Sequence, residues 1–311
     1  MFLLIAILWI DEILNPSVLQ FSGDSVNIFG LMGILKTYPI VIVAFSILLL
    51  LLQAIVLNQV LENHRLMERN QLLTAAVYIL IISSSPILTN PFGVLLTNFI
   101  LIVQLNVVLN IYGKKEPLRQ IFDAAFLIGV ASLLHLPVLV FIIFLWACLV
   151  LYQLFTWREW LISIIGITIP HLFAGTYFYW TGSFETEFNA FTSFFTQIHP
   201  PVFSGGIYLY IIWGFLTLLT FISLRQISKG LTESTIPIRK KYRVIVFFLI
   251  AAFVSAIFAG ETLMSYLVIA AIPVSAFIAL YLSKTKKTFI PEIIVILLFL
   301  SIMVWKYLNL A

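Results

Sequence analysis

The stretch PIVIVAFSILLLLLQAIVLNQV, residues 39–60, contains no charged side chain and no glycine. A helix needs about 20 mainly apolar residues to cross the hydrocarbon core of a bilayer, and this stretch meets that requirement. Arg65 and Arg69 follow it closely. The pattern predicts a membrane-spanning helix with a basic segment at one end.

Further apolar segments repeat this design along the chain. We predict spans at residues 39–60, 71–87, 92–112, 121–134, 138–155, 160–180, 208–227, 244–259, 263–283 and 289–307. Residues 1–10 are apolar but supply only about half of a span, and they lack the basic region and cleavage site of a signal peptide. We expect them to end a longer span that begins upstream in the native gene. The predicted fold class is therefore all-α, a polytopic transmembrane helix bundle of about 10–11 spans in a single integral-membrane domain, residues 1–311.

The basic residues indicate how this bundle is oriented. All but two of the 17 Lys and Arg residues lie in segments that would face the same side of the membrane; the exceptions are Lys36 and Lys306. Basic segments collect on the inner side of membranes, so we predict that the N-terminus is inside. The loop 228–243 is then inner, and the loops 11–37 and 181–207 are outer.

The composition agrees with a membrane protein. Hydrophobic residues make up 62% of the chain and charged residues 10%, whereas a soluble domain has about 25% charged residues. The formal charge of +4 lies mainly in the predicted inner loops, where attraction to anionic headgroups explains it. We therefore expect membrane lipids as partners and no nucleic acid. The single cysteine, Cys148, can form no intrachain disulfide.

Two acidic residues open the first outer loop. Asp11 and Glu12 follow the first apolar stretch without a spacer, so we expect them at headgroup depth. One hypothesis makes them a catalytic base or metal ligands at the membrane face; the alternative makes the acids of this loop helix caps. Carboxylates together with imidazoles could hold a divalent cation, although the sequence shows no fixed ligand spacing.

The second outer loop combines polar and aromatic residues. Glu185, Glu187 and His199 are candidate substrate-binding residues in it. The loop is rich in phenylalanine, and three of these residues share one face of a predicted helix: Phe188, Phe191 and Phe195. Such a helix lies in the membrane interface. It could form a lid over a lipid-facing cavity, or it could only seal the fold.

Three more polar residues are candidate substrate contacts, because polar groups within the membrane are costly and often functional. His171 follows Pro170 inside a predicted span, His135 lies in a tight outer turn, and Glu261 lies in another outer turn.

Other polar residues in the spans have structural explanations. Asp123 can pair with Arg119, four residues earlier. Gln104, Asn106 and Asn110 lie on one span, where hydrogen bonds between helices account for them.

Two short segments carry a family resemblance. FDAAFLIGVASLL, residues 122–134, then Pro137 and WREW, residues 157–160, resemble an uncharacterised family of polytopic inner-membrane proteins from Bacteroidota, a domain of unknown function. The resemblance runs through most of the chain. It implies a multi-pass protein of the bacterial inner membrane and implies no particular chemistry.

The order of the outer loops is similar to that of the GT-C class of membrane glycosyltransferases. Those enzymes carry an acidic residue just after the first span, surface helices in that loop and a mobile outer loop after the seventh span. Asp11 and Glu12, the apolar run 28–35 and the loop 181–207 match this order. The resemblance implies a polyprenyl-phosphate-linked substrate. The chain departs from the class at Ser265, which precedes Tyr266 where many members have arginine, and its outer side has no arginine to bind a diphosphate.

Three functions remain open from the sequence. The first is a GT-C-like transferase that acts at the outer face, with Asp11 or Glu12 as base or metal ligand. The second is a non-catalytic assembly or scaffold subunit that binds other proteins of an envelope complex. The third is a transporter of lipids or small molecules, although the two halves show no matching broken helices.

Overall fold

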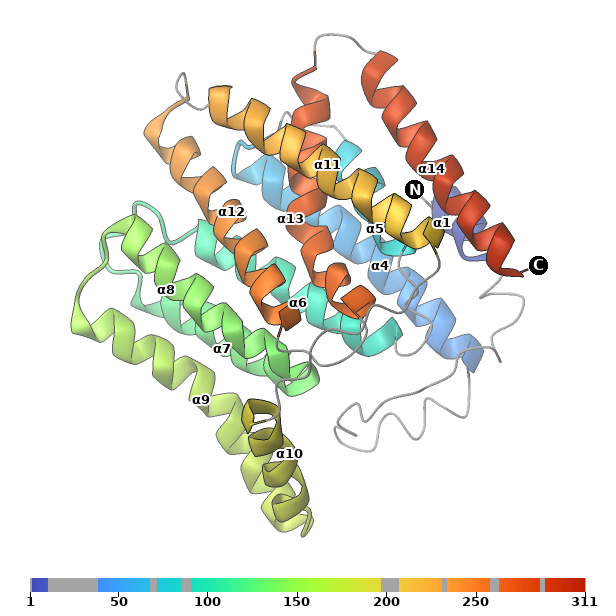
Figure 1. Ribbon diagram of the computed structural model, residues 1–311. Helices are drawn as coiled ribbons and strands as arrows, with labels where there is room; N and C mark the ends of the chain where they lie inside the picture. The colour runs from blue at the N-terminus through green and yellow to red at the C-terminus, as the bar shows by residue number, and fades with distance from the viewer. Residues whose placement is uncertain are drawn as a thin grey trace.

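The computed structural model describes residues 2–10, 39–67, 72–84, 91–196, 207–230, 234–257, 263–285 and 289–310. Every secondary-structure element within these residues is helical (Figure 1). In chain order they are α1 (Phe2–Leu8), α4 (Pro39–Asn63), α5 (Leu73–Ser83), α6 (Pro91–Leu109), α7 (Leu118–Leu134), the 3-10 helix η3 (Leu136–Val140), α8 (Phe141–Tyr152), α9 (Trp157–Trp180), α10 (Phe184–Thr196), α11 (Ile207–Gly230), α12 (Ile236–Ile257), α13 (Leu263–Ser283) and α14 (Phe289–Leu310).

Each predicted span corresponds to a helix. The ends of α7 and α9 agree with the prediction, and both ends of α13 do so. The start of α12 differs: it begins at Ile236 rather than at residue 244 and includes the basic run from Arg239 to Arg243. Lys and Arg are good helix formers whose aliphatic stems can lie along apolar surface, so a basic run does not end a helix.

Three helices are long and apolar enough to cross a membrane. They are Ile40–Asn63 in α4, Trp157–Trp180 in α9 and Tyr210–Ser228 in α11. Other apolar helices among the described residues are shorter, such as Leu73–Ser83 in α5 and Gly93–Leu109 in α6.

Helix α13 forms the centre of the bundle. Every residue from Val268 to Leu280 is buried, and α13 packs against α5, α6, α11 and α12 (Figure 1). A helix that is apolar on all sides must be covered on all sides. These four helices therefore cover α13.

Basic segments that are far apart in the sequence meet at one end of the bundle, which we call the basic end. Two lysines at the start of α12 make contacts there with the turn after α4 and with the end of α6. The Lys241 ammonium donates to the backbone carbonyl of His64 at 3.3 Å. The Lys240 ammonium lies 5.0 Å from the Tyr112 ring centroid, a cation–π distance. Three segments predicted to face the same side of the membrane are thus neighbours.

Helices α9 and α10 form an arm at the edge of the bundle, with α10 folded back along α9 (Figure 1). Only 22% of the apolar stretch within α9 is buried in the protein. The buried side of α9 packs tightly on α7 through two glycines. A Cβ atom on Gly129 would lie 2.8 Å from the Ile167 carbonyl oxygen, and one on Gly166 would lie 2.8 Å from the Ala125 Cβ.

We predict that Gly129→Ala destabilises the protein relative to Gly214→Ala. The added methyl group at Gly129 would overlap α9, and overpacking costs about 1–3 kcal/mol. Gly214 lies inside α11, and a Cβ atom added there would have no other atom within 4 Å. Alanine at this position therefore only raises the helix propensity of α11. Thermal unfolding of both variants in detergent measures the difference. Equal unfolding temperatures would contradict the tight α7–α9 contact.

Candidate functional site

Half of the candidate residues from the sequence can be located in the structure. Asp11, Glu12, His199 and Glu261 lie outside the described residues. His135, His171, Glu185 and Glu187 lie on or beside α7, α9 and α10. Of the predicted outer site, the structure therefore describes one region, where the arm meets the end of α7.

His171 connects the arm to the bundle. Its Nδ1 lies 3.0 Å from the Ile167 carbonyl oxygen. Because a carbonyl oxygen only accepts, Nδ1 carries the proton and donates. Its Nε2 lies 3.3 Å from the Ser132 Oγ on α7, and its ring meets the Phe191 ring of α10 edge-on at 6.1 Å between centroids. His171 thus contacts both α7 and α10.

The Ser132–His171 pair has the geometry of a hydroxyl beside a base. In a nucleophile–base pair the hydroxyl proton passes to the imidazole. Here the Ser132 hydroxyl is also 2.8 Å from the Gly129 carbonyl oxygen, which competes for that single proton. Ser132 is almost fully buried, so a substrate could not reach its oxygen in this arrangement. The contact is better suited to linking α7 and α9 than to nucleophilic catalysis.

His135 ends α7. Its backbone N–H donates to the Ala131 carbonyl at 2.9 Å, and the 3-10 helix η3 begins at the next residue, Leu136, with Pro137 in its first turn. The side chain is half-buried, and desolvation lowers the pKa of its imidazole to about 4. The ring is therefore neutral at pH 7 and can accept or donate a hydrogen bond without charge.

Glu185 and Glu187 lie in the first turn of α10. Carboxylates there are favoured by the partial positive charge of a helix N-terminus, which explains both residues without a ligand. On the same helix Phe184 and Phe188 stack at 5.7 Å between ring centroids. The predicted phenylalanine-rich helix therefore exists, with its Phe191 against His171.

A metal site is not formed by these residues. Within the described residues no group of three or more His, Cys, Asp and Glu side chains is placed to hold a metal ion. The predicted ligands Asp11 and Glu12 lie outside that part of the chain, so the divalent-cation hypothesis depends on them.

Sequence reasoning missed a buried polar chain in the bundle centre. The Tyr78 hydroxyl of α5 donates to the Gln53 Oε1 of α4 at 2.6 Å, and the Gln53 Nε2 donates to the Leu95 carbonyl at 2.8 Å. The Asn98 Nδ2 of α6 lies 3.4 Å from the Tyr78 hydroxyl and donates to the Val268 carbonyl of α13 at 2.9 Å. All three side chains are fully buried. Their polarity within apolar predicted spans is the signal that could have identified them.

The predicted hydrogen bonds between helices are found in part. The Asn106 Oδ1 accepts from the His64 Nε2 at 3.0 Å, which joins α6 to the turn after α4. Asn110 bonds back to Asn106 on its own helix. The buried Gln104 amide has no partner within the described residues. Asp123 lies 3.8 Å from Arg119 as predicted.

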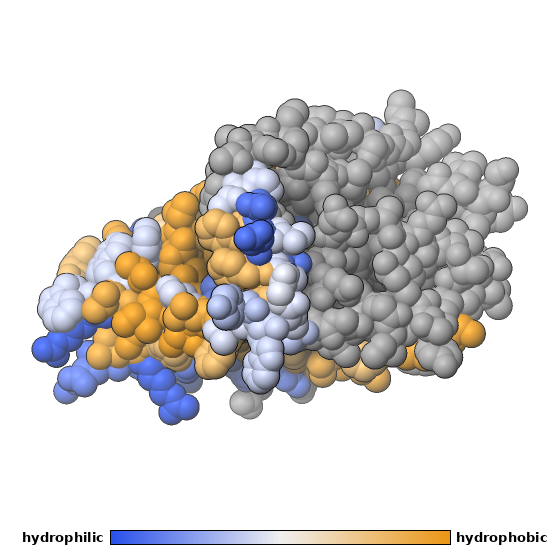
Figure 2. Space-filling model, turned by 90° about the horizontal axis from the view of Figure 1, so that it is seen from below, coloured by the Kyte–Doolittle hydropathy of each residue, from blue (hydrophilic) through white to orange (hydrophobic). Residues whose placement is uncertain are grey.

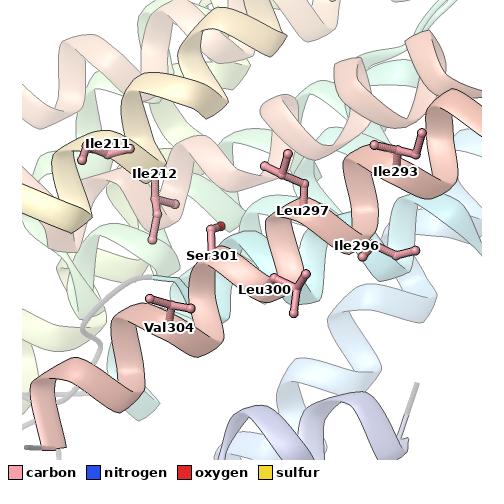
Figure 3. Close-up of a pocket in the computed structure, with 8 residues that line it drawn as sticks. All are labelled: Ile211, Ile212, Ile293, Ile296, Leu297, Leu300, Ser301 and Val304. Atoms are coloured by element: carbon pink, nitrogen blue, oxygen red, sulfur yellow. The ribbon is translucent and has the colours of Figure 1, made fainter.

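An apolar groove of about 470 Å³ runs between α11 and α14 (Figure 3). Ile211 and Ile212 form one wall, and the other wall is α14 from Ile293 to Val304. Among the described residues that line it, Ser301 is the only polar one. Such a groove can hold an apolar chain, but it has no group for acid–base chemistry.

We predict that Tyr78→Phe destabilises the protein by about 1–3 kcal/mol, because it leaves the buried Gln53 carbonyl oxygen without its donor. The matched control is Tyr152→Phe, since the buried Tyr152 hydroxyl has no partner within the described residues. That variant should be as stable as the parent or slightly more stable. Chemical or thermal unfolding in detergent compares them, and a larger loss in Tyr152→Phe would refute the polar chain.

Comparisons with known proteins give a family and no function. No curated protein matches the chain, and no solved structure matches it. The model of one family of unknown function, DUF6427, matches residues 26–311. This agrees with the predicted membership of an uncharacterised family. Because the match covers most of the chain, the protein belongs to the family of unknown function DUF6427.

Proposed function

We propose that the chain is a multi-span protein of the bacterial inner membrane, with about 10–11 spans and its N-terminus inside. The contacts at the basic end carry this proposal. The turn after α4, the end of α6 and the start of α12 meet there, as they must if the basic segments share the inner side. The length and apolar composition of α4, α9 and α11 also support it.

Exposed apolar side chains agree with a lipid environment. Phe173 and Trp180 on α9 and Phe221 on α11 are largely exposed. Figure 2 shows apolar residues over much of the described part of one face, with hydrophilic residues along its lower edge and in one patch near the middle. In water such a surface would cost free energy and favour aggregation, whereas lipid covers it without that cost.

We further propose that the protein is a transferase that uses a polyprenyl-phosphate-linked substrate at the outer face. The observation that favours this is the apolar groove between α11 and α14, which suits the chain of such a lipid. Asp11 or Glu12 would act as base or metal ligand.

One observation favours a non-catalytic subunit of an envelope complex. Helix α9 contacts mainly α7 and α10 and leaves most of its surface uncovered. A peripheral helix of this kind can pack against a helix of another membrane protein. In this alternative the arm is the contact surface, and Asp11 and Glu12 are dispensable.

The topology predicts which positions can be labelled from outside. In a Cys148→Ala background, Ser193→Cys on α10 should react with a membrane-impermeant thiol reagent in intact cells. Ser228→Cys near the end of α11 should react only after the membrane is permeabilised. Labelling of position 228 in intact cells would overturn the proposed orientation.

The transferase proposal predicts that Asp11→Asn and Glu12→Gln together abolish activity but leave expression and membrane insertion unchanged. The assay is lipid mass spectrometry of a deletion strain that carries each allele, in which an unused polyprenyl-linked donor should accumulate. Glu116→Gln is the matched control, because Glu116 is an exposed carboxylate in a predicted inner segment, away from the outer face. Full complementation by the double variant would exclude catalysis by these acids and favour the assembly subunit.

A further inference from the structure

A polar pocket of about 660 Å³ lies at the basic end, opposite in character to the apolar groove. The end of α4 and the turn after it provide Glu62 and Arg65, and the end of α13 provides Ser283 and Lys284. Arg65 has φ 57°, in the left-handed region that a side chain such as arginine rarely adopts. Helix α4 ends here, and the Leu66 N–H donates back to the Leu61 carbonyl at 2.9 Å.

Two further contacts bring the start of α12 beside the pocket. The Lys284 ammonium donates to the Tyr242 hydroxyl at 3.4 Å and lies 5.4 Å from the centroid of the same ring. Lys241 precedes Tyr242 and bonds the carbonyl of His64, the residue before Arg65. Cations from three segments therefore converge: Arg65, Lys241 and Lys284.

These cations have no carboxylate partner in the described residues. The one ion pair found there joins Arg119 to Asp123. Glu62 is the only acidic residue that lines the pocket, and it accepts a hydrogen bond from Asn58 on its own helix at 2.7 Å. The pocket thus has more positive than negative charge, and part of that charge is uncompensated.

The charges also affect one another. Burial, together with the positive charge of Arg65, lowers the pKa of the Lys241 ammonium. Burial is also the main cause that lowers the pKa of His64, which is therefore neutral at pH 7. An anion between Arg65 and Lys241 would remove their repulsion and favour the charged lysine.

We propose that this pocket binds a phosphate group, supplied by the headgroup of an anionic phospholipid. Arg and Lys are the side chains that bind phosphate oxygens, arginine in a bidentate manner. Basic pockets between membrane helices on the inner side bind acidic headgroups. The phospholipid source depends on the proposed membrane topology, whereas binding of phosphate itself does not.

The test measures binding to the purified full chain in a neutral detergent. The probes are dioctanoyl phosphatidic acid and inorganic phosphate, followed by microscale thermophoresis. The binding variant is R65Q combined with K284Q, which removes both charges without adding a bulky group. The matched control is R158Q, because Arg158 is an exposed cation at the start of α9, away from the pocket-lining residues.

The parent should bind the short-chain lipid, and the double variant should bind it at least about tenfold more weakly, since it loses two charge-assisted contacts to the phosphate group. The control should bind as the parent does. If inorganic phosphate binds equally well with the same dependence on Arg65 and Lys284, the site is a phosphate site with a soluble ligand. Unchanged binding in the double variant, or an equal loss in R158Q, overturns the proposal.

Folding is checked by thermal unfolding of each variant. If the double variant does not fold, lipid binding is measured with the single variant K284Q. Lys284 follows the last residue of α13, so its substitution leaves the helix intact. Normal lipid binding by a folded K284Q would also overturn the proposal. A failure of the topology test would remove the phospholipid as the source without affecting the phosphate measurement.

Discussion

The arrangement of the central helices depends on one chain of hydrogen bonds, Gln53 to Tyr78 to Asn98 to the Val268 carbonyl. Buried amides and hydroxyls lose their water, and an apolar environment offers no replacement, so a hydrogen bond to another protein group stabilises them. This chain of hydrogen bonds joins α4, α5, α6 and α13. Since side-chain hydrogen bonds need defined distances, they fix the axial register of helices whose apolar surfaces alone would slide.

The fold could be predicted from the sequence because the elements are independent of one another. An apolar run of span length satisfies its own backbone hydrogen bonds as a helix, so residues 263–283 could be assigned without knowing what surrounds α13. The same logic misplaced the start of α12. Residues from Arg239 to Arg243 were treated as loop because they are charged, but backbone hydrogen bonding continues through them in the helix. The phenylalanine-rich helix was predicted correctly because its periodicity is local.

The contacts of the candidate site were less accessible, because they depend on which helices are neighbours. His171 was a candidate from its place inside a predicted span, but its contact with Ser132 requires α7 and α9 to pack together. The same holds for Tyr78, an ordinary interior residue until Gln53 and Asn98 are placed beside it. Helices that are apolar on nearly all sides carry little information about which face meets which neighbour. The small residues Gly129 and Gly166 were the available signal for the α7–α9 contact.

The position of the proposed phosphate pocket explains why it needs cations from several segments. It lies at the end of α13, where the helix dipole presents partial negative charge and favours a cation such as Lys284. That end of the helix disfavours an anion, so Lys284 alone would mainly neutralise the helix end. Arg65 and Lys241 come from other segments and supply the additional charge that phosphate requires. Because α13 is also the helix that accepts from Asn98, the pocket and the central hydrogen bonds are built on the same helix. A ligand at the basic end would therefore act on the helix around which the bundle is packed.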